Sequence, residues 1–205
     1  MPSPRPHDLL WGLSPQALPE DAPAWAREVL ASGQPVVVRR AVCAPGRVPV
    51  GLRGAARSQR LALEMALVDI RRILRPEVLK VRDCAGLPAA LQALVTVAPL
   101  LDATGLAWGP TGGVGYQLAT GVPVVHAASD LDLLLRTPTL LDRSDARRLL
   151  TALQGAACPI DLQLETPHGS VALREWAGEA RQVLLKSSSG PCLVSNPWQA
   201  AECAA

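Results

Sequence analysis

The chain has 205 residues, 49% of them hydrophobic, and a formal net charge of +2. This length allows one large domain or two small ones with a sizeable core, and the nearly balanced charge argues against a strongly basic nucleic-acid-binding protein. No apolar run reaches about 18 residues, so no membrane span is expected. Met1 to Pro6 is rich in proline and no long apolar run follows it, which predicts a cytoplasmic protein without a signal peptide.

The chain contains five cysteines, whose number is odd and whose spacing is wide: Cys43, Cys84, Cys158, Cys192 and Cys203. No C-x-x-C pair occurs among them. This pattern argues against both a zinc site and a disulfide framework. We therefore expect buried or incidental thiols in a reducing compartment.

The elements predicted for the first part of the chain are, in order, a helix at 19–33, strands at 36–40 and 48–53, and a longer helix at 57–74. Pro23 in the first turn and Gly33 after the last turn bound the first helix. Pro76 ends the second helix. Together these elements predict a small N-terminal αβ domain over residues 1–82.

One segment of this domain contains six arginines and no acidic residue before Glu64: Arg39, Arg40, Arg47, Arg53, Arg57 and Arg60. In the predicted longer helix, Arg57 and Arg60 share a face. Such a segment suits a polyanionic small molecule, so we expect Arg53, Arg57 and Arg60 to bind phosphate groups and to face the acidic site described below. A solvated surface is the alternative for each of them.

In the second part of the chain, helices are predicted at 87–103, 144–154 and 171–180, and Pro99 should kink or break the first of them. Strands are predicted at 106–109, 122–126, 130–136, 160–165, 182–186 and 192–194. A glycine turn followed by a short helix is predicted at 110–121. This content predicts an α+β fold. The N-terminal unit would pack on a mixed sheet with helices on one face, formed by residues 83–205.

Three aspartates lie in predicted strands of this second domain. Strand alternation places Asp130 and Asp132 on one face, where two carboxylates repel each other unless a cation lies between them. Mg²⁺ is the expected ion, because it prefers carboxylate and phosphate oxygens. Asp161 follows on a later strand, and three such carboxylates can hold two metal ions about 4 Å apart for displacement at phosphorus. Asp161 on an exposed edge strand is the alternative.

The turn formed by Thr111, Gly112 and Gly113 precedes a predicted helix. Backbone N–H groups at such a helix start can bind phosphate oxygens, although a plain turn is the alternative. Ser129, directly before Asp130, is a further candidate substrate contact. Lys186 ends a strand beside a serine-rich turn and is placed to reach a phosphate, with an ordinary surface lysine as the alternative.

The order of glycine turn, D-x-D strand and single-aspartate strand resembles the DNA polymerase β-like nucleotidyltransferase superfamily. The interval from Gly113 to Asp130 is longer than usual there, as if a strand at 122–126 were inserted. The chain also contains longer motifs: RPHDLLWGL (5–13), PVGLRGAARSQR (49–60), GPTGGVGYQLATG (109–121), SDLDLLLR (129–136), DLQLETPHG (161–169) and VLLKSSSGP (183–191). Together they resemble one family, the malonate decarboxylase holo-acyl carrier protein synthases, also called phosphoribosyl-dephospho-CoA transferases.

This resemblance implies an enzyme that moves the phosphoribosyl-dephospho-CoA group from triphosphoribosyl-dephospho-CoA to a serine of the acyl carrier subunit of malonate decarboxylase, releasing pyrophosphate. It implies Asp130 and Asp132 as functional aspartates. Two alternatives remain open: a nucleotidyltransferase that uses an ordinary nucleoside triphosphate, and an inactive nucleotidyltransferase fold used as a binding or antitoxin module. Neither a nucleic-acid nor a membrane partner is expected.

Overall fold

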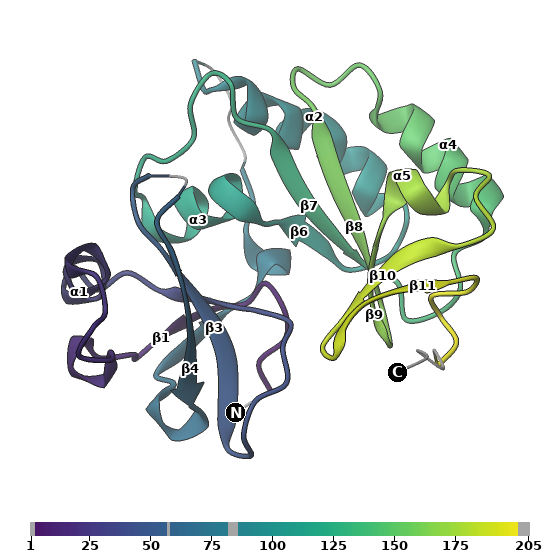
Figure 1. The fold of residues 1–205 in the computed structure, drawn as a ribbon. Helices are drawn as coiled ribbons and strands as arrows, with labels where there is room; N and C mark the ends of the chain where they lie inside the picture. The colour runs from purple at the N-terminus through teal and green to yellow at the C-terminus, as the bar shows by residue number, and fades with distance from the viewer. Residues whose placement is uncertain (1–2, 57, 82–85, 201–205) are drawn as a thin grey trace. The chain divides into compact units, whose positions relative to one another are not determined.

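The structure, a computed structural model, describes residues 3–56, 58–81 and 86–200 (Figure 1). The chain forms two compact units, Met1–Arg75 and Pro76–Ala205. The boundary predicted from the sequence lay after residue 82. Over the described ranges the units contain two sheets and five α-helices, so the predicted α+β class is confirmed. Within the same ranges, no helix is long and apolar enough to cross a membrane.

The first unit is built on a five-stranded sheet in the order β4-β3-β2-β1-β5, in which every pair is antiparallel. Its elements are β1 (Leu9–Trp11), η1 (Pro15–Ala17), α1 (Ala24–Ala31), β2 (Val36–Val38), β3 (Arg47–Arg53), β4 (Arg60–Ala66), η2 (Leu67–Asp69) and β5 (Arg72–Leu74). Helix α1 begins after Pro23 and ends before Ser32, and it buries Ala26 and Leu30 in the core of this unit. The predicted helix at 19–33 is therefore real but shorter.

The predicted helix at 57–74 is wrong. From Arg60 onward its residues form β4, η2 and β5, and β4 pairs with β3 in unbroken register from Arg47↔Ala66 to Arg53↔Arg60. Leucine, alanine, glutamate and methionine are good helix formers, but intrinsic propensity predicts structure only weakly. The alternation of Leu61, Leu63 and Met65 fits a strand whose one side packs on the core. Strand pairing therefore overrides the local helix propensity. β1 was not predicted either.

The second unit contains a six-stranded sheet in the order β11-β10-β9-β8-β7-β6. Its strands are β6 (Trp108–Pro110), β7 (Leu131–Arg136), β8 (Ile160–Thr166), β9 (Gly169–Ala172), β10 (Val183–Ser187) and β11 (Gly190–Val194). Only β7 and β8 pair in parallel, and the other four pairs are antiparallel. The parallel pair requires a crossover connection, which the helix between these two strands provides.

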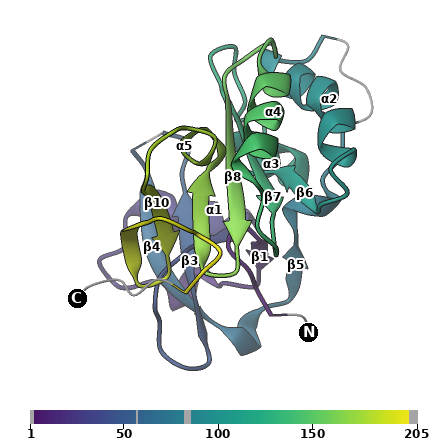
Figure 2. The same cartoon turned by 90° about the vertical axis from the view of Figure 1, so that its right-hand side faces the viewer.

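The helices of this unit are η3 (Pro76–Val78), α2 (Ala89–Asp102), α3 (Gly112–Thr120), α4 (Arg143–Leu153) and α5 (Leu173–Trp176). Alternate leucines of β7 and β8 form one core with residues of α2, α4 and α5. Figure 2 shows α2 and α4 beside these two strands. We call this side of the sheet the leucine face. The opposite side, which carries Asp132, Asp161, Gln163 and Glu165, is called the carboxylate face. Pro99 lies inside α2 without dividing it into two helices.

Three further local predictions differ from the structure. Residues 122–126 form no strand; Val124 N and Val125 N instead donate to Gln117 Oε1. His126 is accordingly exposed rather than part of an apolar strand. Of the predicted helix at 171–180 only α5 is helical, because the preceding residues pair with β8 as β9. Valine-rich segments indicate strands only where a neighbour offers backbone partners.

The cysteines are not all thiols. Cys192 is disulfide-bonded, whereas Cys43 and Cys158 are free thiols. The expectation of thiols throughout is therefore wrong at Cys192, because an odd count and wide spacing do not fix which cysteines meet in space. Cys84 and Cys203 lie outside the described residues.

Candidate functional site

Asp132 and Asp161 lie directly beside each other on the carboxylate face. They are register partners in the parallel pair of β7 and β8, and neighbouring strands lie about 4.8 Å apart. Aligned residues of a parallel pair point to the same face, so both carboxylates leave the sheet on the same side. Both residues are half-buried. The sequence expectation that a later strand brings Asp161 to the D-x-D motif is what this register provides.

Gly112, the first residue of α3, packs against the Asp132 side chain. Its φ of +55° lies in the left-handed region, which side chains other than hydrogen rarely allow. A Cβ atom added there would overlap the Asp132 carboxylate. Thr111 N donates to Asp132 O at 2.9 Å. The glycine turn is therefore attached to the aspartate strand through both its backbone and its close packing.

The start of α3 presents backbone N–H groups next to this carboxylate. Gly115 N donates to Thr111 O at 2.9 Å, which is the first backbone hydrogen bond of the helix. The amides of Gly112, Gly113 and Val114 precede it, and amides in that first turn have no partner within a helix. The space around a Cβ at Gly113 is open. An anion can therefore approach the positive end of the helix dipole closely.

Asp161 is held by a neighbour that the sequence analysis missed. Gln163 Nε2 donates to Asp161 Oδ1 at 3.0 Å, and Lys186 Nζ donates to Gln163 Oε1 at 3.5 Å. These three residues come from β8 and β10 and share the carboxylate face. The alternation of β8 placed Gln163 on the same face as Asp161, so that signal was present in the sequence.

Asp130 directly precedes β7 and is exposed. Burial raises the pKa of the Cys158 thiol, and the negative charge of Asp130 raises this pKa further. Asp130 therefore lies close to the segment that leads into β8. Ser129, a predicted substrate contact, accepts a hydrogen bond from His126 N at 3.0 Å through its hydroxyl and closes a turn there.

Magnesium was expected at three carboxylates. Across the described ranges, no three His, Cys, Asp or Glu side chains gather as a group that could hold a metal ion, so Asp130 does not join Asp132 and Asp161 in a single cluster. The pair by itself fits Mg²⁺, because this ion is commonly bound by one or two carboxylates, with waters and substrate phosphates as its other ligands. The residues present are thus compatible with the expected ion.

The predicted phosphate-binding arginines lie in the first unit. Arg53 and Arg60 are register partners at the loop end of the β3–β4 hairpin, and both are exposed. Arg57 lies outside the described residues, and its expected helical spacing from Arg60 is lost with the helix. Arg47 Nε contacts Glu64 Oε2 at 2.9 Å, so this arginine of the segment is already paired with an acid.

A buried ion network occupies the other end of the carboxylate face. Arg136 Nε contacts Glu77 Oε1 at 2.9 Å, and its Nη1 contacts Glu165 Oε2 at 3.5 Å. Glu165 on β8 therefore contacts an arginine of the neighbouring strand β7. The network joins η3, β7 and β8. It therefore fixes the strands that carry Asp132 and Asp161.

Two family models match the chain. The model of the phosphoribosyl-dephospho-CoA transferase MdcG N-terminal domain matches residues 5–76, and that of the C-terminal domain matches residues 77–197. The two matched regions meet where the structure divides into its two units. No solved structure matches the chain.

Curated relatives match over nearly their full length. The phosphoribosyl-dephospho-CoA transferase of Pseudomonas putida (strain W619) is 66% identical, with 100% of both chains covered. Those of Pseudomonas aeruginosa and Azotobacter vinelandii are each 54% identical, covering 97% and 96% of this chain and 96% and 95% of the relative. Together with the two matched domains, this similarity shows that the chain is a transferase enzyme belonging to the phosphoribosyl-dephospho-CoA transferase family.

Proposed function

We propose that this enzyme transfers the phosphoribosyl-dephospho-CoA group from triphosphoribosyl-dephospho-CoA to a serine of the small acyl carrier subunit of malonate decarboxylase, with release of pyrophosphate. One observation carries the chemistry: Asp132 and Asp161 are register partners on parallel strands, and the start of α3 packs against Asp132. An acidic pair beside an anion-binding helix start is suited to phosphoryl transfer.

The donor phosphates are proposed to bind at the start of α3. The amides of Gly112, Gly113 and Val114 would donate to phosphate oxygens, and the open space at Gly113 allows this approach. Lys186 is exposed on β10, and the Gln163 side chain connects it to Asp161 by one hydrogen bond to each. It adds positive charge on the same face. The exposed Arg53 and Arg60 are proposed to add further contacts to the polyanionic donor, with affinity that falls as salt rises.

In the reaction, the serine Oγ forms a bond to the α-phosphorus, and the bond from that phosphorus to the oxygen of the leaving pyrophosphate breaks. Asp161 is proposed to accept the proton of the serine hydroxyl. Gln163 donates to Oδ1 of this carboxylate and so fixes its orientation. The pair Asp132 and Asp161 would hold Mg²⁺, and the charge of the bound ion would offset that of the triphosphate and of the pyrophosphate.

The acceptor follows from the motif resemblance along the chain, since the names of the relatives state only the group that is transferred. Mass spectrometry tests it directly. The purified apo-carrier subunit is incubated with this enzyme, Mg²⁺ and either triphosphoribosyl-dephospho-CoA or ATP. The expected product is a carrier subunit heavier by one phosphoribosyl-dephospho-CoA group, with the modification on one serine.

Two controls define the result. The Ser→Ala carrier subunit should remain unmodified, and a short peptide around the acceptor serine should react poorly, because it lacks the docking contacts of the folded carrier. Modification by a nucleotide from ATP, without reaction of the larger donor, would overturn the proposed donor. Equal rates with peptide and folded carrier would overturn recognition of a protein partner.

A further inference from the structure

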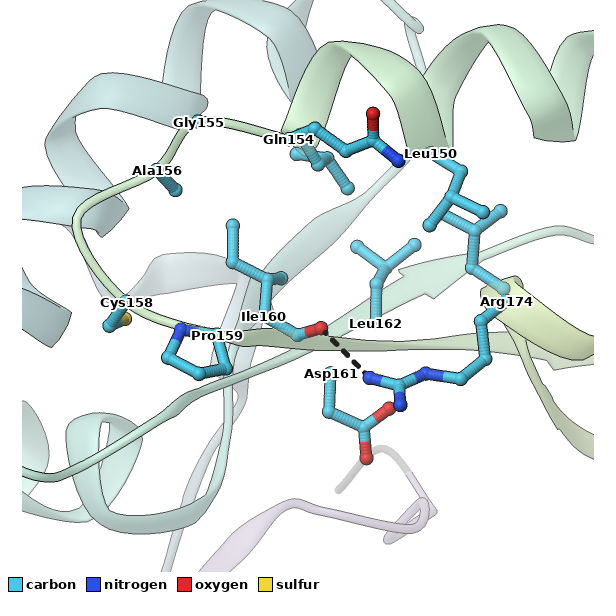
Figure 3. Close-up of a pocket in the computed structure, with 12 residues that line it drawn as sticks. Leu150, Gln154, Gly155, Ala156, Cys158, Pro159, Ile160, Asp161, Leu162 and Arg174 are labelled. Carbon is cyan, nitrogen blue, oxygen red and sulfur yellow. Dashed lines mark hydrogen bonds between the residues drawn. The ribbon is translucent and has the colours of Figure 1, made fainter.

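A cavity of about 280 Å³ opens beside Asp161 (Figure 3). It lies between the end of α4, residues 154–159, the start of β8 and the start of α5. The proposed transfer step does not use it. Asp161 is one of its lining residues, but its carboxylate points to the other side of β8 from the side chains of Ile160 and Leu162 (Figure 3). A molecule bound in the cavity would therefore lie across the start of β8 from the carboxylate that is proposed to act on the acceptor serine.

The walls of this cavity are mainly branched aliphatic side chains. They come from three elements: Leu150 and Leu153 from α4, Ile160 and Leu162 from β8, and Leu173 from α5. Pockets with such walls favour flat or apolar groups, and their few polar side chains set the orientation. The main wall of the cavity therefore favours a ring system over a phosphate or a sugar.

The polar side chains are few and chemically distinct. Gln154 offers both an amide donor and an amide acceptor. Arg174 offers a guanidinium, and its Nη2 donates to Ile160 O at 3.5 Å along the β8 edge (Figure 3). The register of β9 with β8 begins at Gln163↔Ala172, so Arg174 lies over the part of β8 that precedes this pairing.

The size of the cavity limits its occupant. Sites for whole small molecules measure roughly 300–1,000 Å³, so about 280 Å³ holds one ring system and not the entire donor. A pantetheine arm is long and rich in amides, and would need an extended groove with many backbone partners. A nitrogen-containing ring could pack its faces against the leucine walls and form hydrogen bonds with Gln154 along its edge. A diphosphate attached to that ring could form charged hydrogen bonds with Arg174.

We propose that this cavity binds the adenine ring of the dephospho-CoA part of the donor, with Arg174 at its diphosphate. The identity of the donor rests on the proposed function. The chemical class, an adenine nucleoside diphosphate, rests on the cavity itself. The pantetheine arm then extends away from the cavity, and the triphosphate lies at Asp132 and the start of α3.

Ligand binding tests this assignment without any transfer reaction. Dephospho-CoA, ADP, adenosine and 4′-phosphopantetheine are each added to the full chain, and saturation-transfer NMR identifies the bound protons. Dephospho-CoA and ADP should bind with the strongest saturation on the adenine protons. Binding of phosphopantetheine without ADP, saturation confined to the pantetheine arm, or no binding of dephospho-CoA would each overturn the proposal.

Adjacent alanines give a matched pair of variants. Ala156 lines the cavity, whereas Ala157 is exposed and is not part of the lining. Ala156→Trp fills the cavity and should weaken dephospho-CoA binding by roughly tenfold or more, because the adenine faces lose their buried contact. Ala157→Trp should bind like the unchanged enzyme. Equal affinity in both variants would overturn the proposal.

A surface substitution keeps the test independent of how Ala156→Trp folds. Arg174 is exposed, so Arg174→Gln should fold normally. This substitution should lower the affinity for ADP by roughly tenfold while the affinity for adenosine changes little, because the charged hydrogen bonds to the diphosphate are lost. Loss of adenosine and ADP binding to the same extent would contradict the placement of the diphosphate.

The outcome is separable from that of the proposed function. If dephospho-CoA binds in the cavity but no carrier subunit is modified, the proposed function fails and the adenine site stands. If the carrier is modified and Ala156→Trp transfers as fast as Ala157→Trp at low donor concentration, the proposed function stands and the adenine site fails.

Discussion

Gly112 lies directly against the carboxylate of Asp132, so that the helix start and the aspartate strand are fitted to each other. The glycine has a φ of +55°, and a Cβ atom there would overlap Asp132 Oδ2. At Gly113, one residue later, the same Cβ would meet nothing within 4 Å. Two neighbouring glycines therefore have different reasons to be glycine.

Gly112→Ala should lower both stability and transfer. The left-handed backbone costs on the order of 1–3 kcal/mol for a residue with a side chain, and Asp132 must move. Gly113→Ala is the matched variant and should keep its stability, because helix and space both accept alanine. Thermal unfolding and single-turnover transfer check this. Equal thermal stability of the two variants would contradict the fitted contact.

Replacing either register-paired aspartate should abolish transfer while the fold survives. Asp132→Asn and Asp161→Asn keep the side-chain shape but remove a negative charge. For Asp161 the proposed loss of a proton acceptor predicts a decrease in the transfer step of about 10²- to 10⁴-fold. Asp145→Asn, on the exposed side of α4, serves as a control. A decrease in donor affinity alone would show Asp161 to be a binding residue.

Gln163 should act by orienting Asp161. Gln163→Leu removes the hydrogen bond to Asp161 Oδ1 and also the contact with Lys186. We expect slower transfer at saturating donor with a smaller effect on donor affinity, and a shift in the pH profile of the transfer step. Lys186→Met instead should weaken donor binding. If Gln163→Leu changes only thermal stability, the side chain is merely structural.

The ion network at Arg136 should support the sheet rather than the chemistry. The Arg136 side chain is only 13% exposed and that of Glu165 only 5%. Arg136→Met leaves buried carboxylates without their cation, which costs about 3 kcal/mol or more. Arg148→Met removes an exposed pair with Asp145 and should cost at most about 1 kcal/mol. Chemical denaturation measures both, and equal losses would contradict a structural role for the buried network.

Alternation and order in the chain predicted which aspartates belong to the candidate site, but not which two lie side by side. β8 alternates strictly, so Asp161 and Gln163 had to share a face, and the D-x-D motif had to lie at the start of a strand. The sequence does not show which strand neighbours which. The register Asp132↔Asp161 and the contact of Gly112 with Asp132 depend on that pairing.

Local patterns failed where tertiary pairing decides. Residues 60–66 contain good helix formers, yet β3 offers them a complete set of strand partners. Val124 and Val125 favour a strand, yet their amides are bound by the Gln117 side chain. The cavity beside Asp161 also escaped sequence analysis, because it is formed by the ends of three elements that are apart in the chain.

The reactivity of the Cys158 thiol should depend on the charge of Asp130. Burial raises the pKa of this thiol, and the Asp130 carboxylate raises it further. A raised pKa leaves less reactive thiolate at a given pH, so the pH dependence of alkylation is displaced to higher pH. Asp130→Asn removes one of the two causes and should move that curve to lower pH, giving faster alkylation near pH 8. Peptide mapping after iodoacetamide treatment measures the rate at Cys158, with the free thiol of Cys43 as a control in the same digest. Unchanged alkylation of Cys158 across the pH range would show that Asp130 does not act on this segment, and would place its charge elsewhere at the site.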